Sequence, residues 1–139
     1  MKTIFKIFPE RKLVLTCFTG TINFKDVINW FDAVQKHQGF SQEFSGVVDL
    51  RKGVFGRILD GKTVQMAEKA KELADYMISK DFTRAKWAIL ADTPMETSLM
   101  LVYSNSASQK HPIRIFSTIQ AAEEYLGVAL ADAFKELST

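Results

Sequence analysis

The chain has 139 residues, 47% of them hydrophobic and 24% charged, which fits a globular domain that can bury a sizeable core. Its net charge is +2 at pH 7 and its basic residues occur at most in pairs, so we expect no nucleic-acid partner. A single cysteine, Cys17, excludes an internal disulfide and predicts a reducing, cytoplasmic location.

Neither a signal peptide nor a membrane span is expected. The apolar run near the N-terminus, within MKTIFKIFPERK, is too short for a signal peptide. The most apolar long window, residues 87–103, contains Asp92 and Glu96, which a spanning helix would have to bury in lipid. We therefore expect a single domain over residues 1–139.

Two β-rich runs open the chain, TIFKIF and KLVLTCFTG, and the linker PERK with Pro9 separates them. A four-residue linker suits a β-hairpin. Alternate residues of the second run point to opposite faces, and both faces are largely apolar. This strand is therefore predicted to be well buried.

The stretch INFKDVINWFDAVQKH is predicted to form a helix. Asn23 can cap its first turn, and Asp26 is well placed there to complement the helix dipole. Trp30 is predicted to lie toward the edge of the buried stripe, and packing is the expected role of the aromatic residues. The stripe itself comprises Phe24, Val27, Ile28, Phe31 and Val34.

The middle of the chain alternates strands with helices. FSGVVDLRKG is predicted to be a strand that ends near Leu50, and DGKTVQMAEKAKELADYMISK to be an amphipathic helix. AKWAILAD is short and apolar, which is typical of a strand that is covered on both faces. The next helix is expected to begin at TPME, where Thr93, Pro94 and Glu96 fit a capping box.

PIRIF is the last predicted strand. The helix after it, in STIQAAEEYLG, is expected to take Ser117 as its cap and to stop at Gly127. VALADAFKEL then forms a final short helix, whose apolar stripe either folds back on its own domain or packs against a second copy. Because two-fold dimers are the commonest soluble assembly, we expect a homodimer.

The predicted order is β-β-α-β-α-β-α-β-α, followed by the short final helix. A hairpin that leads into βαβ units predicts an α/β fold. We expect a mixed, mostly parallel sheet of about five strands, with an N-terminal β-hairpin and helices on both faces.

The segment GRILDGKT, Gly56 to Thr63, matches the P-loop pattern G-x-x-x-x-G-K-[ST]. A P-loop needs a strand, a tight turn and a helix in succession, because backbone N–H groups at the helix start hold the phosphates. A helix is predicted after Lys62. The apolar run WAILAD ends in Asp92, as does the type of strand that supplies a second, metal-binding carboxylate in P-loop proteins.

Other features disfavour phosphate binding. The predicted strand end near Leu50 leaves five residues before Gly56, and the pattern follows the third strand rather than the first. Ile58 and Leu59 resist the dihedral angles of a phosphate-binding turn. Asp60 would place a carboxylate beside the phosphates. We therefore keep a nucleotide-binding enzyme using residues 56–63 only as a remote alternative.

Three stretches in this order, FSGVVDLRKGVFG, AILADTPMETSLMLVYSN and IRIFSTIQAAEEYLG, resemble the SpoIIAA-like group. These are small bacterial proteins with the STAS-type fold of anti-sigma-factor antagonists. The resemblance runs from Phe5 to Leu126. It implies a STAS-like domain that regulates or binds other proteins and is not an enzyme.

In the phosphorylation-switched members of this group, a strand ends in Asp-Leu and an Asp-Ser pair opens the next helix. A partner kinase phosphorylates that serine. Asp49 and Leu50 match the strand end here, and Asp60 matches the first residue of the pair. Gly61 stands where the group has serine, so the phosphoacceptor does not carry over. Thr63 is the nearest hydroxyl, at a different place on the helix.

Asp49 and Asp92 each end an apolar strand, so both are expected at the carboxyl rim of the sheet, where open α/β folds bind ligands. Two rim carboxylates could hold Mg²⁺, but strand-end aspartates more often order their own turns, and we expect that role and no metal. His37 and His111 lack companions at metal-ligand spacing, so we expect surface or structural roles. Cys17 lacks an evident base and is expected to be an inert thiol.

We therefore predict a regulatory or protein-interaction domain without enzymatic activity or cofactor. The alternative is a small-ligand or lipid-binding protein that uses the carboxyl rim. A rim pocket lined by Phe55, Ile58 and Leu59 would favour a small apolar ligand, and a flat rim would favour a protein partner. The candidate residues for either role are Asp49, Arg51, Phe55, Arg57, Asp60, Lys62, Thr63, Asp92 and Thr93.

Overall fold

The structure is a computed structural model that describes residues 2–55, 63–82, 84–107 and 112–138. The strands are β1 (Lys2–Phe8), β2 (Leu13–Ile22), β3 (Ser45–Phe55), β4 (Trp87–Leu90) and β5 (Ile113–Phe116). The helices are α1 (Phe24–Lys36), α2 (Thr63–Ser79), α3 (Pro94–Ala107), α4 (Ile119–Leu126) and α5 (Ala131–Ser138).

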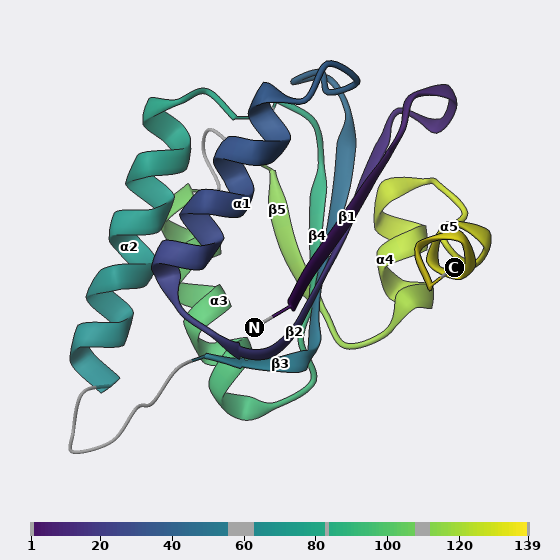
Figure 1. The fold of residues 1–139 in the computed structure, drawn as a ribbon. Coiled ribbons are helices and arrows are strands. Elements are labelled where there is room, and N and C mark those ends of the chain that lie inside the picture. The colour runs from purple at the N-terminus through teal and green to yellow at the C-terminus, as the bar shows by residue number, and fades with distance from the viewer. Residues whose placement is uncertain (1, 56–62, 83, 108–111, 139) are drawn as a thin grey trace.

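The strands form one five-stranded sheet in the order β1-β2-β3-β4-β5. β1 pairs antiparallel with β2 as a hairpin, and the other neighbouring strands are parallel. Helices α1, α2 and α3 cover one face of the sheet, and α4 and α5 cover the other (Figure 1). The predicted fold class, a mixed and mostly parallel α/β sheet with helices on both faces, is confirmed.

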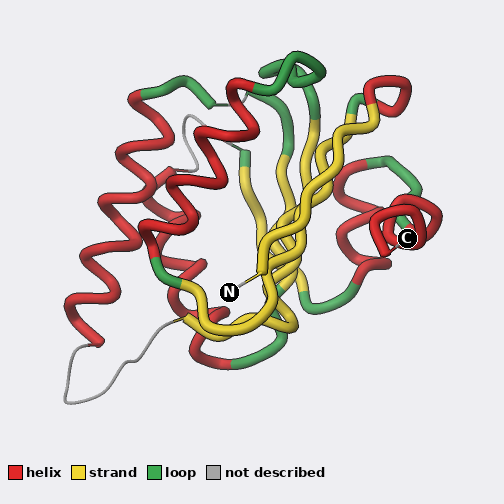
Figure 2. Tube along the Cα trace, in the orientation of Figure 1, coloured by secondary structure: helices red, strands yellow, loops and turns green. Residues whose placement is uncertain are grey.

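β3 is longer than predicted. It continues to Phe55 instead of ending near Leu50, because Lys52 to Phe55 pair with Thr19 to Ile22 of β2. The partner strand, rather than the local sequence, sustains this extension, and the yellow ends of the two strands run side by side in Figure 2. One objection to the P-loop pattern was therefore wrong, since Gly56 directly follows the end of β3.

The larger core lies between the sheet and α1, α2 and α3. α1 begins as predicted: the Asn23 side chain accepts a hydrogen bond from the Asp26 N–H at 2.8 Å. Trp30 does not lie at the edge of the buried stripe, because its side chain is only 6% exposed. Its indole N–H reaches the buried Thr16 hydroxyl of β2 at 3.0 Å, which lets a polar group enter the core. Ile28, predicted to be inside, is half-buried.

α3 and α4 begin close to their predicted positions. α3 starts at Pro94, and the Thr97 N–H donates to the Thr93 carbonyl at 3.0 Å. α4 is capped by Thr118 rather than Ser117, since the Thr118 hydroxyl accepts from the Ala121 N–H at 3.2 Å. Ser117 and Thr118 both carry a hydroxyl that can cap a helix, and the structure uses Thr118. Gly127 ends α4 with a φ of 71°, as expected for a left-handed cap.

α5 folds back on its own chain. Leu130 and Ala133 are fully buried in a second core that contains Phe8, Leu13 and Leu15 of the hairpin. This was one of the two alternatives for the C-terminal stripe. Because the chain itself covers that stripe, the stripe no longer supports a homodimer, which stays a prediction. None of the described helices combines the length and apolar character that a membrane crossing requires.

Candidate functional site

The predicted site residues fall into separate places. Asp92 and Thr93 follow β4, but Asp49 does not end its strand as predicted, because β3 continues to Phe55. Asp49 instead pairs with Leu90, the last residue of β4. Phe55 ends β3 and Thr63 begins α2, with side chains outside the described part of the structure. Arg57, Asp60 and Lys62 lie outside the described residues altogether, together with Ile58, Leu59 and Gly61.

Asp49 and Arg51 form a clamp at an irregularity of β3. The register moves from Cys17–Asp49 to Thr19–Lys52, so β3 carries one more residue than β2 over this step. Asp49 Oδ1 accepts the Arg51 backbone N–H at 3.0 Å and Arg51 Nε at 2.9 Å. Asp49 Oδ2 accepts Arg51 Nη2 at 2.9 Å. The bidentate pair therefore orders the bulged backbone, so Asp49 has a structural role, but within its strand rather than in a turn after the strand.

The clamp sets the electrostatics around it. The hydrogen-bonded carboxylate of Asp49 raises the pKa of Arg51, and the charge of Asp92 adds to this effect. Burial, followed by the charge of Asp49, raises the pKa of Cys17 to about 11. The Cys17 thiol lies 3.8 Å from Asp49 Oδ2 and donates to it. A thiol with this pKa is protonated at neutral pH, which agrees with an inert role.

Both Asp49 oxygens are already engaged, which argues against a metal-binding role for this residue. Among the described residues, no three His, Cys, Asp or Glu side chains gather as metal ligands would. His37 is exposed, and its Nδ1 accepts the Gly39 N–H at 3.0 Å. His111 lies outside the described residues.

Arg51→Met is expected to lower the free energy of unfolding by about 2 kcal/mol, because it leaves the buried Asp49 carboxylate without its charged partner. Arg84→Met is the matched control. Arg84 also meets an aspartate at 2.9 Å, but both side chains of that pair are more than half exposed. The control should cost less than about 0.5 kcal/mol in urea unfolding. Equal losses in the two variants would contradict the structural role of the clamp.

Asp92 and Thr93 belong to an open groove of about 390 Å³ at the same rim. The groove lies between the connections that follow β4 and β5. Its lining comprises Ala91, Asp92, Thr93, Pro94, Thr97, Ser98, Ile115, Phe116 and Ser117. Asp92, Thr93, Ser98 and Ser117 are exposed, while Ile115 and Phe116 are half-buried. We call this surface the rim groove.

Sequence reasoning found two residues of the rim groove and missed the others. Ser117 directly follows β5, so the rule that selected Asp92 at the end of β4 would also have selected it. Thr97 and Ser98 carry no comparable signal, because their contribution depends on how α3 crosses the sheet. Asp49 and Arg51 do not line the groove, so the predicted set divides into a structural clamp and an exposed surface.

No protein-family model matches the chain, and no curated protein matches it. A solved structure does resemble it. This is an uncharacterized protein of the DUF3478 family from Shewanella loihica, which is described as having a SpoIIAA-like fold. The two chains are 10% identical, with a TM-score of 0.52, and the match covers 89% of this chain and 93% of the other. The chain therefore has a SpoIIAA-like fold, as the sequence resemblance predicted.

Proposed function

We propose that the protein is a non-enzymatic interaction domain that binds a protein partner through the rim groove. The observation that carries this proposal is the composition of the groove. Exposed Asp92, Thr93, Ser98 and Ser117 surround half-buried apolar side chains, which is the mixture of polar rim and apolar centre that protein interfaces use.

The electrostatics of the rim also favour recognition over catalysis. The Asp49 carboxylate is held by two hydrogen bonds from the Arg51 guanidinium. The pKa of the nearby Cys17 thiol is raised. Asp92 is exposed and provides a charge that a partner can meet. The described lining of the groove therefore offers contact area and the charge of Asp92, which suit recognition of a partner.

Photo-crosslinking tests the proposal. A crosslinking residue at Ser98 or Ser117 is expected to capture one protein from the native host that the same residue at Glu43 does not capture. Glu43 is exposed at the opposite, amino end of the sheet. With the purified partner, Asp92→Lys should weaken Kd at least about tenfold, or about 1.4 kcal/mol. Glu43→Lys makes the same charge change and should leave Kd within about twofold.

Equal effects of the two charge reversals, with both variants folded, would contradict binding at the rim groove. Capture of the same protein from Glu43 and from Ser98 would contradict it as well, because a single partner would then contact both ends of the sheet.

Nucleotide binding is not expected, although Gly56 follows β3 directly. Ile58, Leu59 and Asp60 remain poor residues for a phosphate-binding turn. Calorimetry with Mg-ATP and with Mg-GTP should show no affinity tighter than about millimolar, which corresponds to about 4 kcal/mol. Micromolar binding that Lys62→Ala abolishes would instead establish a working P-loop.

Regulation by the serine switch of the SpoIIAA-like group is not expected either, since Gly61 stands at the phosphoacceptor position. The intact mass of protein purified from its native host should therefore include no stoichiometric phosphate. A single phosphate mapped to Thr63 would show that the switch has moved along the helix.

A further inference from the structure

An open pocket of about 440 Å³ lies at the amino ends of β4 and β5, at the opposite end of the sheet from the rim groove. Lys86 directly precedes β4, Arg114 is the second residue of β5, and Tyr125 comes from α4. Pro112 and Ile113 complete its lining. We call it the basic pocket, because its lining carries two positive charges and no negative one.

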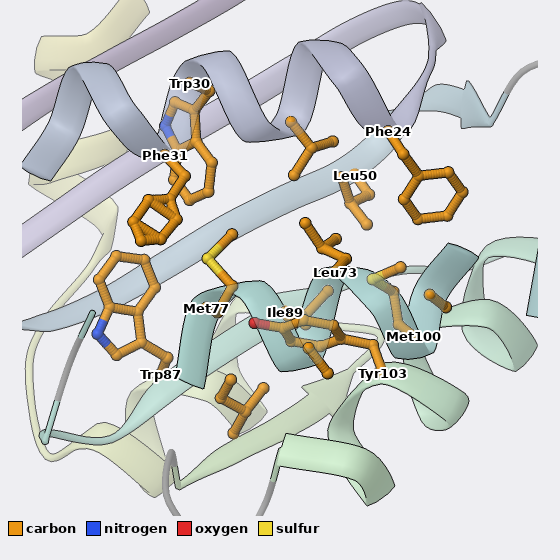
Figure 3. Close-up of a cluster of buried hydrophobic side chains, with 14 of the residues drawn as sticks. Phe24, Trp30, Phe31, Leu50, Leu73, Met77, Trp87, Ile89, Met100 and Tyr103 are labelled. Atoms are coloured by element: carbon orange, nitrogen blue, oxygen red, sulfur yellow. The ribbon is translucent and has the colours of Figure 1, made fainter. Parts of the chain in front are cut away.

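Strand geometry brings the two cations to the same face of the sheet. Arg114 pairs with Ala88, which lies two residues after Lys86 and belongs to the second core beneath α4. Side chains two residues apart on an extended backbone point the same way. Trp87 and Ile113 point to the other face and enter the larger core, where Figure 3 shows Trp87. Lys86 and Arg114 therefore both lie on the α4 side of the sheet.

The Tyr125 ring holds both cations in place. Lys86 Nζ lies 5.2 Å from the centre of this ring and the Arg114 guanidinium 5.5 Å, which are cation–π distances. Lys86 Nζ also donates to the Tyr125 carbonyl at 3.5 Å. The Tyr125 hydroxyl donates to the Pro112 carbonyl at 3.1 Å, which fixes the ring at the start of β5. The two charges are thus gathered beside one ring without the help of a ligand.

Within the described part of the chain, neither cation meets a carboxylate. The other described arginines, Arg11, Arg51 and Arg84, each pair with one. Lys86 and Arg114 take part in no such ion pair. Two like charges held beside one ring repel each other, and an anion between them would relieve that repulsion. The basic pocket is therefore suited to an anion.

We propose that the basic pocket binds a small phosphate anion, either free phosphate or a phosphate monoester. Such a group carries about 1.5 to 2 negative charges at pH 7, which match the two cations, whereas a carboxylate carries one. The Arg114 guanidinium can donate two parallel hydrogen bonds to phosphate oxygens, and Lys86 adds a point charge. Pockets for small ligands commonly enclose roughly 300–1,000 Å³, a range that includes this one. The site is independent of the rim groove and of the partner proposed for it.

Titration with glycerol 3-phosphate in about 0.15 M NaCl, followed by ¹⁵N NMR, tests the proposal. The amide signals of Lys86, Arg114 and Tyr125 are expected to shift saturably, with a Kd of about 1 mM or tighter. Glycerol, which lacks the phosphate, should shift none of them. Inorganic phosphate is the second probe. If it binds at least as tightly as the ester, the site is assigned to free phosphate, and weaker binding assigns it to a phosphate monoester.

Lys80 offers a matched control. Its Nζ also lies over a tyrosine ring, 5.6 Å from the centre of Tyr76, but the Tyr76 hydroxyl is already bonded to the Asp32 carboxylate. The Lys80 and Tyr76 signals should therefore stay in place during the titration, and Lys80→Gln should leave Kd within about twofold.

Lys86→Gln and Arg114→Gln should each weaken Kd at least about fivefold, while Arg114→Lys, which keeps the charge, should weaken it less. Lys80, Lys86 and Arg114 are exposed, so these variants should fold, and the NMR spectrum checks this directly. The proposal is overturned if neither phosphate compound gives a saturable shift at the basic pocket. It is also overturned if Lys80→Gln weakens binding as much as Arg114→Gln does.

Discussion

Phe31→Ala is expected to lower the free energy of unfolding by about 3–5 kcal/mol, a large part of the roughly 5–15 kcal/mol that stabilises a typical domain. Phe31 is fully buried in α1. Its ring lies 4.3 Å from that of Phe82 and 5.4 Å from that of Tyr76, measured between centroids. Truncation removes these contacts and leaves a void that the sheet beneath it prevents from closing.

Guanidinium unfolding measures this loss as a lower midpoint with an unchanged slope. Leu101→Ala is the control, because Leu101 is 48% exposed on α3 and alanine favours the helix. The control should change stability by less than about 0.5 kcal/mol. A loss at Phe31 below about 1 kcal/mol would mean that α1 does not pack on the sheet as described.

Gly46→Ala is expected to destabilise the protein by about 2–3 kcal/mol through overpacking. Gly46 of β3 pairs with Trp87 of β4, and an added Cβ would lie 2.4 Å from the Trp87 ring. The ring cannot move freely, because its indole N–H is bonded to the Phe44 carbonyl at 3.2 Å. It also lies 5.0 Å from the Phe82 ring, measured between centroids.

Two further variants identify the cause of this effect. Gly39→Ala is the matched control, since its added Cβ would meet nothing closer than 3.3 Å and the site is a loop. The double variant Gly46→Ala/Trp87→Leu should be more stable than the sum of the two single losses predicts, because the smaller side chain removes the clash. Strict additivity would show that the clash is not the reason.

The sequence was sufficient for the architecture because hydrophobic periodicity and helix caps are local signals. The apolar run before Asp92 and the Asn23 cap both lie where they were predicted. The errors arose where a distant partner decides the outcome. β3 extends to Phe55 because β2 runs beside it, and Trp30 of α1 can be buried because Thr16 of β2 accepts its indole N–H.

The site was only partly predictable for the same reason. The strand-end rule brought Asp49 and Asp92 to one rim, and Asp92 influences the pKa of Arg51 there. It could not separate Asp49, which is held by Arg51, from Asp92, which is free to meet a partner in the exposed groove.

Hydrogen–deuterium exchange with the captured partner tests the central claim most directly. On binding, protection should increase at the rim groove, over residues 91–98 and 115–117, and stay unchanged at the amino ends of the parallel strands near Glu43. Asp92→Lys should remove this protection at the same protein concentrations. Protection at the amino end, with the rim groove unchanged, would contradict the account.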